Sequence, residues 1–511
     1  MILAMKTGYS SILQSVESDK EILDREWKDI NWKSIEYSIF KIQKRIFEAE
    51  KEGNYRKVNR LCRLLVNDKR SILYSIYVVT KRNKGKRTSG IDNMVIRHDW
   101  ERMDLFYELS ERKISLHNPK PVNRVYIPKK NGKTRPLGIP TIVDRIYQEI
   151  CKLALEPMWE AKFESTSYGF RPCRGIGDAI AKIHSFTRGL KRPYIFEGDF
   201  RSCFDSLSHQ HIMDKIGNFP LKNLIKKWLE AGYLENKVFY STRTGTPQGG
   251  IISPLLANIA LHGMEEALGI TYKRVKVGDT YTYVNNSKYV VIRYADDFIV
   301  LCKTLEDANN VYGLLDDYLE DRGLTLAPDK TKITHIYDGF DFLGLNIRCY
   351  KGQDRDRVLI KASKKSIESF KRKAKLIVRR CFPWNIEESI TSLNHLINGT
   401  GYFWRIGSNK SLFNKMDNYM YEILLRQTKR WYPNKSVQWI VRKHFKESLH
   451  PKYHWKWTFT DPNTECQVDR MSWIKIKYHK CIKYKATPYD VEYDAYIERR
   501  YSRTPFQYLY G

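Results

Sequence analysis

The sequence predicts an α+β fold in which two hairpins are combined with long helices. Apolar residues recur at three- and four-residue spacing over residues 22–82, which is the period of an amphipathic helix. Residues 120–140 are typical of a hairpin whose turn contains Asn131-Gly132, a pair that accepts the positive φ of a tight turn. Residues 287–302 form a second strand–turn–strand pattern, in which apolar runs flank a polar bend.

The other elements follow in chain order. Gly53-Asn54 marks the break between two helices of the N-terminal run, and helical spacing returns over residues 141–187. An apolar strand over residues 193–199 ends at an aspartate. Four further helical segments are predicted, at residues 305–322, 362–381, 386–399 and 411–429. The residues beyond these helices are basic and aromatic and show weaker periodicity.

The charge of the chain favours a polyanionic partner. Its 511 residues include 89 Lys and Arg against 58 Asp and Glu, which gives a formal net charge of +31 at pH 7. Each phosphate that a basic side chain neutralises releases counterions, so nucleic acid is the favoured partner and an anionic lipid surface is the alternative. A basic loop at residues 81–90 is predicted to contact RNA.

Cysteine usage and hydropathy exclude several protein classes. The nine cysteines are scattered and form no C-x-x-C pair, which speaks against a zinc ribbon or a disulfide framework and favours a reducing compartment. No apolar run is long enough to cross a bilayer, and the N-terminal residues lack the apolar core of a signal peptide. We therefore expect no membrane partner.

Two strand ends carry the carboxylates that indicate chemistry. Asp296 and Asp297 stand between two apolar runs, where desolvating two charges is costly unless they are paired or hold a metal. The strand at residues 193–199 ends at Asp199. Side by side, these strand ends would form a carboxylate cluster suited to two Mg²⁺ ions, with Mn²⁺ as a substitute. Aspartate is also common in ordinary turns, but the flanking hydrophobic hairpin and the separate strand ending at Asp199 favour the metal site.

Several motifs resemble those of reverse transcriptases. Residues 294–297 (Y-A-D-D) are similar to the family signature, residues 197–205 (E-G-D-F-R-S-C-F-D) resemble the palm motif with the first catalytic aspartate, and residues 245–258 (G-T-P-Q-G-G-I-I-S-P-L-L-A-N) resemble the block between them. Three further motifs resemble those of the group II intron branch, namely R-P-L-G-I-P-T at 135–141, S-Y-G-F-R-P at 167–172 and F-D-F-L-G at 340–344. The motifs stand in the order that the family has.

This resemblance implies a right-hand polymerase with fingers, an antiparallel-sheet palm and a helical thumb. The implied boundaries are 1–90 for an N-terminal helical extension, 91–355 for the fingers and palm, 356–445 for the helical thumb or maturase domain, and 446–511 for a basic, aromatic segment that binds nucleic acid. The thumb assignment depends on the similarity of residues 393–395, 401–405 and 431–436.

The resemblance also implies roles for individual residues. Asp199, Asp296 and Asp297 match the catalytic triad, and with the carbonyl of Phe200 they would hold two Mg²⁺ ions. The residues expected at the incoming nucleotide are Lys129, Lys133, Arg135, Phe204, Gln248 and Lys332. Among these, Phe204 matches the ring that lies under the sugar and clashes with a 2′-hydroxyl. The residues expected to grip the primer are Asp341, Phe342, Leu343 and Gly344.

The implied function is that of an RNA-directed DNA polymerase of group II intron type that also binds intron RNA and assists its splicing. The implied partners are a structured RNA, an RNA template with its DNA primer, and deoxynucleotides, while a homodimer stays open. The implied location is the bacterial cytoplasm, as a ribonucleoprotein, with an organelle as the alternative. The paired cysteines of the family's C-terminal H-N-H nuclease are absent from the sequence, so we expect no endonuclease.

Two other functions stay open. A host could have adopted such an enzyme for antiviral defence, spacer acquisition or repair. The chain could also be an RNA-binding splicing factor with little polymerase activity. The second alternative is weakened because the motif residues that a decayed polymerase would lose are all present, namely Arg135, Asp199, Gln248, Asp296 and Asp297.

Overall fold

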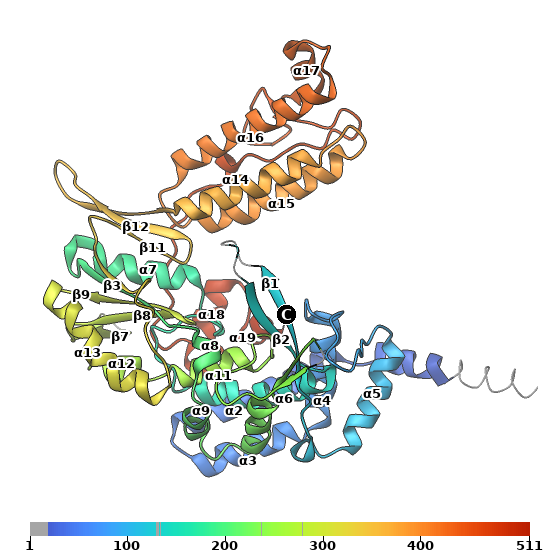
Figure 1. Ribbon diagram of the computed structural model, residues 1–511, viewed down its shortest axis with the longest axis vertical. Coiled ribbons are helices and arrows are strands. Elements are labelled where there is room, and N and C mark those ends of the chain that lie inside the picture. The colour runs from blue at the N-terminus through green and yellow to red at the C-terminus, as the bar shows by residue number, and fades with distance from the viewer. Residues whose placement is uncertain (1–18, 129–131, 133, 237, 278–279, 511) are drawn as a thin grey trace, which may run out of the picture.

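The computed structural model describes residues 19–128, 132, 134–236, 238–277 and 280–510. Figure 1 shows a large lower body and a smaller helical upper body. The lower body contains the N-terminal helices and a central sheet, and the upper body contains helices α14 to α17. A small sheet of β11, β12 and β13 lies between the two bodies.

The N-terminal helices pack around one long buried helix. Their bounds are α2 (Trp32–Lys51), α3 (Tyr55–Val66), α4 (Lys69–Tyr77), α5 (Asp99–Glu111) and α6 (Ile142–Glu160), and residues 19–28 are also helical. α2, α3 and α4 pack against α6, which is buried on nearly all sides. The predicted helix break is confirmed, because Gly53 has a φ of 71° and Asn54 caps α3 by accepting a hydrogen bond from Lys57 N at 3.1 Å.

The predicted hairpin at residues 120–140 is confirmed, while most of its predicted tight turn lies outside the described residues. β1 (Val122–Pro128) and β2 (Thr134–Ile139) pair antiparallel, and Pro128 pairs with Thr134 at the turn end of their described residues. Gly132 does have the expected positive φ, at 81°.

An antiparallel sheet forms the centre of the lower body. Its strands lie in the order β10 (Lys332–His335), β3 (Tyr194–Asp199), β9 (Asp297–Cys302) and β8 (Val290–Tyr294). The strands are largely buried because α7 (Ile176–Thr187) packs on β8, and α13 (Leu305–Asp321) packs on β3 and β9. The strands predicted at residues 193–199 and 287–302 are therefore confirmed.

The upper body consists of three helices that the sequence predicted, α14 to α16, and of α17, which it did not predict. Their bounds are α14 (Lys364–Arg379), α15 (Ile386–Trp404), α16 (Lys410–Trp431) and α17 (Val437–His444). Phe370, Trp404 and Phe413 are almost fully buried in the core that these helices share. The sheet below them consists of β11 (Phe340–Phe342), β12 (Leu345–Tyr350) and β13 (Arg357–Ala362), and α14 follows directly from β13.

Shorter elements complete the chain. In the lower body they are η1 (Val78–Arg82), η2 (Ile114–Leu116), η3 (Arg188–Leu190), α8 (Cys203–Ser206), α9 (His209–Ile216), α10 (Lys222–Glu230), β4 (Tyr233–Glu235), β5 (Val238–Tyr240), α11 (Ser253–Ala260), α12 (Met264–Ala267), β6 (Tyr272–Val277) and β7 (Thr280–Asn285). After α17 come β14 (Phe445–Lys446), β15 (Thr458–Phe459), η4 (Met471–Trp473), η5 (Val491–Tyr493), α18 (Asp494–Tyr501) and α19 (Pro505–Tyr510). No helix in the described part of the chain is long and apolar enough to cross a membrane.

Together these elements confirm the expected α+β right-hand fold. The antiparallel central sheet has the architecture expected of the palm and α14 to α17 that of a helical thumb, while the domain boundaries stay predictions.

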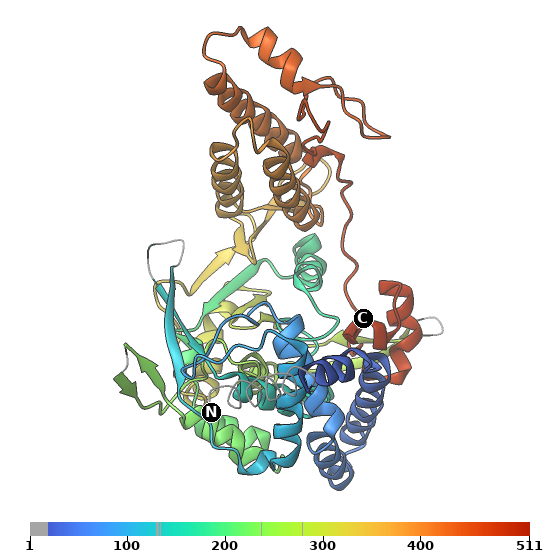
Figure 2. The same cartoon turned by 90° about the vertical axis from the view of Figure 1, so that its right-hand side faces the viewer.

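Residues 446–510, which we call the C-terminal strap, connect the upper body to the lower one. Figure 2 shows this segment descending from the upper body towards the N-terminal helices. Where it arrives, the buried carboxylate of Asp178 on α7 lies 2.9 Å from His479 Nε2. The same carboxylate accepts hydrogen bonds from Ile482 N at 2.7 Å and from Arg500 Nη2 at 2.8 Å. One side chain of the palm therefore holds three separate points of the strap.

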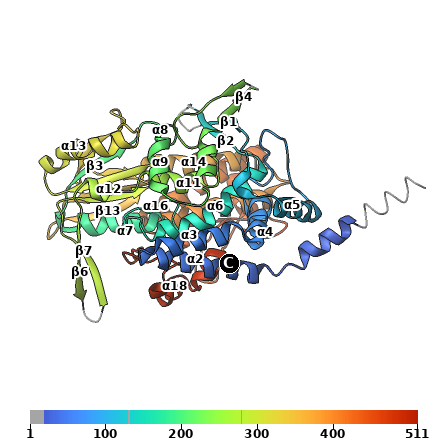
Figure 3. The same cartoon turned by 90° about the horizontal axis from the view of Figure 1, so that it is seen from below.

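The last helices of the strap join the N-terminal helices. Lys44 and Lys51 on α2 form ion pairs with Asp494 at 2.6 Å and with Asp490 at 3.0 Å. Figure 3 shows α18 beside α2 when the molecule is seen from below. The last helices of the strap are thus packed against the lower body. Its predicted binding of nucleic acid stays a prediction.

We expect Tyr510→Ala to loosen α2. The Tyr510 ring is buried against Phe40 and Tyr74, and its hydroxyl bonds Gln43 Oε1. Deleting a buried aromatic ring costs about 3–5 kcal/mol, whereas Tyr510→Phe removes only one hydrogen bond, worth about 1 kcal/mol. Amide hydrogen exchange of α2 should therefore be fastest in the Ala variant and intermediate in the Phe variant. Equal exchange in the Ala variant and the wild type would show that α19 does not stabilise the N-terminal helices.

Candidate active site

β3 and β9 bring together aspartates that are far apart in the sequence. In their antiparallel register, Asp199 at the end of β3 pairs with Asp297 at the start of β9. Tyr294 at the end of β8 also pairs with Asp297, so a two-residue turn joins β8 to β9 and Asp296 stands in that turn. Asp199, Asp296 and Asp297 therefore meet at one edge of the sheet, as the sequence predicted.

The turn that carries Asp296 contains a strained residue and has a tightly packed neighbour. Ala295 has a φ of 57°, in the left-handed region that a residue with a Cβ rarely occupies. Gly169 lies against this turn, and a Cβ built on Gly169 would stand 2.3 Å from Ala295 N and 2.9 Å from Tyr294 C. Only glycine fits at that distance, which gives the physical reason for glycine in the motif S-Y-G-F-R-P.

Arg293 and Asn258 hold the same turn from the interior. Arg293 is almost fully buried, and its Nη1 donates to Asn258 Oδ1 at 3.0 Å and to Ala295 O at 3.2 Å. Asn258 Nδ2 in turn donates to Gly169 O at 2.8 Å. Sequence reasoning quoted Asn258 only as the last residue of a motif and missed Arg293. The available signal was one arginine inside an otherwise apolar strand, V-V-I-R-Y.

Lys330 compensates part of the negative charge at this edge. Its Nζ lies 2.9 Å from Asp199 Oδ1, and this hydrogen bond raises the pKa of Lys330. Asp297 experiences the opposite effect, because burial and the charges of Asp296 and Asp199 raise the pKa of its carboxyl to about 6, with Lys330 acting against them. Asp297 is an exposed residue. Its raised pKa therefore comes from nearby protein atoms and like charges, and the carboxyl is not fully enclosed.

The carboxylates suit a divalent cation, although they do not converge on one point. Among the described residues, no group of three His, Cys, Asp or Glu side chains has the arrangement of a metal site. Oxygen ligands are nevertheless what hard cations such as Mg²⁺ take. After burial, the charges of Asp296 and Asp199 raise the pKa of Asp297, and a cation would relieve the repulsion among these carboxylates. The donor set therefore fits a divalent metal, while in this structure Lys330 supplies positive charge at Asp199.

Two phenylalanines, Phe200 and Phe204, follow Asp199 in the chain. The ring of Phe200 stacks on Phe298 with centroids 4.9 Å apart. Gly198 leaves room for Phe298, since a Cβ on Gly198 would stand 2.1 Å from that ring. Phe204, in α8, is buried, and its carbonyl accepts a hydrogen bond from Thr246 N at 2.7 Å. Phe204 is thus tied to the loop that precedes α11.

A contact between β2 and this loop involves two predicted nucleotide-binding residues. Arg135 Nε donates to Gln248 Oε1 at 2.5 Å, and Gly138 N donates to Gln248 O at 2.7 Å. Arg135 and Gln248, which are more than 100 residues apart, are therefore neighbours at the junction of fingers and palm. Lys129 and Lys133, also predicted to bind nucleotide, lie outside the described residues.

Lys332 lies close to the cluster but pairs with another carboxylate. Its Nζ is 3.5 Å from Glu197 Oε1, its direct partner in the β10–β3 pairing. Lys330, two residues earlier in D-K-T-K, is the lysine that contacts Asp199. Sequence reasoning named Lys332 and missed Lys330, because only the loop before β10 brings position 330 over the end of β3.

The predicted primer-gripping residues form the turn between β11 and β12. Asp341 is exposed and accepts a hydrogen bond from Asn346 Nδ2 at 2.8 Å, while Phe342 is buried. Leu343 and Gly344 have φ values of 50° and 82°, which make the turn. Ser363 N, just before α14, donates to Gly344 O at 3.2 Å. This turn is therefore attached to the base of the thumb.

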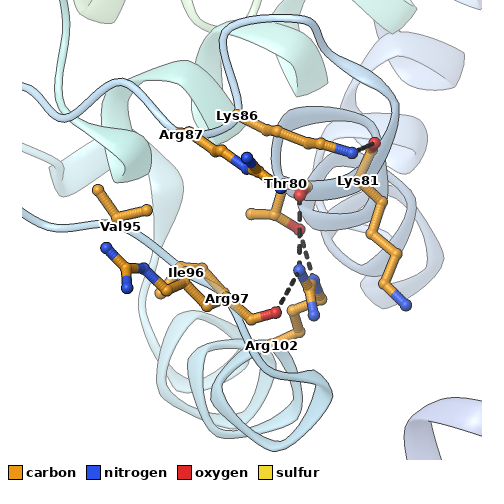
Figure 4. Close-up of a pocket in the computed structure, with 8 residues that line it drawn as sticks. All are labelled: Thr80, Lys81, Lys86, Arg87, Val95, Ile96, Arg97 and Arg102. Atoms are coloured by element: carbon orange, nitrogen blue, oxygen red, sulfur yellow. Dashed lines mark hydrogen bonds between the residues drawn. The ribbon is translucent and has the colours of Figure 1, made fainter. Parts of the chain in front are cut away.

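Figure 4 shows a basic pocket beside the N-terminal helices. Its volume is about 510 Å³, and it is lined by Thr80, Lys81, Lys86, Arg87, Val95, Ile96, Arg97 and Arg102. Arg102 is fixed by hydrogen bonds to Thr80 Oγ1 at 2.9 Å and Asp99 Oδ1 at 2.6 Å. Part of the predicted RNA-contacting loop at residues 81–90 lines this pocket. Its five basic side chains are of the type that binds phosphates.

Three family profiles match consecutive parts of the chain. The profile described as "N-terminal domain of reverse transcriptase" matches residues 27–109. "Reverse transcriptase (RNA-dependent DNA polymerase)" matches residues 127–347, which include all three aspartates. "Group II intron, maturase-specific domain" matches residues 367–445, which contain most of α14 to α17.

Curated proteins show the same relationship. The chain is 35% identical over 322 residues to Protein YkfC of Escherichia coli (strain K12), and the match covers 56% of this chain and 82% of that protein. It is 33% identical over 362 residues to the group II intron-encoded protein LtrA of Lactococcus lactis subsp. cremoris, covering 60% of this chain and 59% of LtrA. It is 28% identical to an uncharacterized 91 kDa protein in the cob intron of Schizosaccharomyces pombe, covering 67% of this chain and 50% of that protein. The chain thus spans somewhat more than half of LtrA. With these matches it belongs to the reverse transcriptase family, in the branch of RNA-directed DNA polymerases that group II introns encode.

Proposed function

We propose that the chain copies RNA into DNA by nucleotidyl transfer at the palm edge, with Asp199, Asp296 and Asp297 as its catalytic residues. The observation that carries this proposal is the β3–β9 register, which pairs Asp199 with Asp297 beside the turn of Asp296. The raised pKa of Asp297 supports it, because the protein maintains unfavourable charge there without a structural need. The match of residues 127–347 to the polymerase profile supports it independently.

The three carboxylates and the carbonyl of Phe200 would hold two Mg²⁺ ions, with Mn²⁺ as a substitute. Bound there, the ions would activate the primer 3′-hydroxyl and stabilise the leaving pyrophosphate. The chain itself brings the carboxylates to one edge of the sheet through strand pairing, and Arg293 and Gly169 keep the turn in position.

The incoming nucleotide would lie between fingers and palm. Arg135 and Gln248 meet at that junction, where a guanidinium complements a triphosphate. Lys330 is better placed than Lys332 to accompany the phosphates, because its partner Asp199 would exchange it for a cation, whereas Lys332 pairs with Glu197. We assign Phe204 to the sugar, and its attachment to Thr246 would keep it in place.

The thumb would hold the RNA template with its DNA primer and also bind a structured RNA such as a group II intron. α14 supports this role, because its sequence K-K-S-I-E-S-F-K-R-K-A-K-L-I-V-R is strongly basic and most of its basic side chains are exposed. The match of residues 367–445 to the maturase-specific profile supports assistance in splicing. A bacterial ribonucleoprotein is the proposed setting, and the homodimer stays a prediction.

Of the two other functions, the splicing factor without polymerase activity is less well supported. Such a factor would have no use for the charge that accumulates at Asp297 or for the strained Ala295 turn. No observation in the structure favours a role in host defence or repair over intron biology.

We expect Asp296→Ala to lower the rate of DNA synthesis at least about 100-fold, because removing a preorganised charge from a catalytic site has effects of that size. The measurement is extension of oligo-dT on poly-rA with Mg²⁺, together with RNA affinity by filter binding. Affinity should stay within a few-fold, since the basic helices lie elsewhere. Asp316→Ala, which removes an exposed carboxylate from α13, is the control and should extend normally. Normal extension by Asp296→Ala would remove the assignment.

We expect Phe204→Ala to lower discrimination against ribonucleotides by roughly tenfold or more. The variant removes the unfavourable contact between the ring and the 2′-hydroxyl, and a contact worth about 1.4 kcal/mol corresponds to a factor of ten. The measurement is the ratio of single-nucleotide incorporation rates for dTTP and UTP. A ratio does not depend on the fraction of folded enzyme, so loss of stability cannot imitate the effect. An unchanged ratio would exclude the ring from sugar selection.

We expect Gly169→Ala to reduce the rate of single-nucleotide incorporation about 100-fold, because a displacement of about 1 Å at a catalytic group has that effect. The added Cβ must displace the Ala295 backbone, from which it would stand only 2.3 Å away. Gly175→Ala is a matched control in the same segment, since no atom lies within 4 Å of its added Cβ. Equal rates for the two variants would show that the Gly169 contact does not position Asp296.

A further inference from the structure

The turn between α14 and α15 presents two stacked aromatic rings to solvent. Trp384 is 79% exposed and Phe382 is 39% exposed. Their ring centroids are 4.8 Å apart and their planes differ by 3°, so the rings are parallel. An exposed tryptophan costs hydration free energy, and Phe382 covers only one of its faces. The outer face of Trp384 is left as a flat, solvated surface of the size of a nucleobase.

The turn that carries these rings is rigid. Asn385 Oδ1 accepts from Phe382 N at 2.7 Å, and Asn385 Nδ2 donates to Arg380 O at 3.0 Å. Cys381, between them, is fully buried, and its carbonyl accepts from Gln427 Nε2 of α16 at 3.1 Å. Because the backbone is held on both sides, little conformational entropy would be lost when a ligand stacks on the rings.

The charge around the rings favours an anionic ligand. Arg379 and Arg380 precede Phe382 and are exposed. The contact of Gln427 with Cys381 also places the last turn of α16, with exposed Lys429 and Arg430, next to the rings. Two exposed carboxylates at the start of α15, Glu387 and Glu388, oppose these four cations. Glu387 is in contact with Cys466 Sγ at 3.8 Å, so part of its charge is directed towards the C-terminal strap.

The two rings lie far from the primer-gripping turn, at the other end of α14. α14 has 16 residues and begins at Lys364, directly after Ser363, whose backbone N–H bonds the primer-gripping turn. At 1.5 Å per residue, its far end lies about 24 Å away. A ligand on Trp384 is therefore held at the outer end of the thumb, beyond the primer end.

We propose that Phe382 and Trp384 form a stacking platform for an unpaired base of a structured RNA. A base that leaves its own helix would stack on the outer face of Trp384, while the neighbouring phosphates pair with Arg379, Arg380, Lys429 and Arg430. This proposal rests on the proposed RNA-binding function and adds to it a site and a ligand chemistry. It predicts a preference for RNA with bulges or loops over fully paired RNA.

The test uses the full chain and two RNA hairpins, one with a bulged 2-aminopurine and one fully paired. The wild type should bind the bulged hairpin more tightly and quench the 2-aminopurine fluorescence. Stacking on an aromatic residue contributes about 1–3 kcal/mol per base, so Trp384→Ala should weaken binding of the bulged hairpin by roughly 5- to 150-fold. Affinity for the paired hairpin should not change. Trp384→Phe keeps a ring and should retain most of the preference.

Leu376→Ala is the matched control, because it removes a 50% exposed apolar side chain from the same body without removing a ring. It should bind both hairpins as the wild type does. Equal affinities of wild type and Trp384→Ala for the bulged hairpin would overturn the proposal. So would a Trp384→Ala chain that binds RNA normally but loses self-association in sedimentation, since the rings would then bind protein. The assay contains no nucleotides or metal, so failure of the polymerase proposal would not affect its result.

Discussion

Asp199 and Asp297 meet only because β3 and β9 pair in one antiparallel register, and most of the site depends on that pairing. A slip of one residue would turn the side chains of β9 to the opposite face of the sheet. Packing on one face of the sheet holds this register. α13 packs on the two strands, and the Phe298 ring occupies the space that Gly198 leaves on β3. The apolar interior of the sheet thereby determines where the charged groups at its edge stand.

That edge is kept in an unfavourable electrostatic state. The pKa of Asp297 is raised to about 6 by burial and by its two carboxylate neighbours, and Lys330 offsets the repulsion only in part. The turn holding Asp296 adds backbone strain at Ala295, which Arg293 restrains by a hydrogen bond to the Ala295 carbonyl. Strain and like charge that serve no purpose in folding are typical of functional sites. A divalent cation would relieve the charge.

The thumb is attached to the rest of the protein at two places. One is the β11–β13 sheet, from which α14 begins beside the primer-gripping turn. The other is the C-terminal strap, which is held by Asp178 on the palm and continues to the N-terminal helices. Because the strap contacts both bodies, movement of the thumb away from the palm would disturb the contacts at Asp178. The stacking platform at the outer end of the thumb is therefore presented in a restricted orientation to the palm.

The sequence alone determined the elements and the motifs of this protein. Helical periods predicted the thumb helices α14 to α16 within a few residues, and the apolar runs around Asp296 and Asp297 predicted the β8–β9 turn. These features are local, because period and turn chemistry act over a few residues. Resemblance to a family then indicated the polymerase and the right-hand fold.

Only the tertiary structure decided which distant groups come into contact. Lys330 rather than Lys332 reaches Asp199, Arg293 supports the turn from within, and the strap that was expected to be a separate segment is packed against α2. The need for glycine at position 169 is explained only by the backbone of Ala295, which lies against it. Such contacts depend on the register and packing of elements far apart in the chain, and no local pattern of residues encodes them.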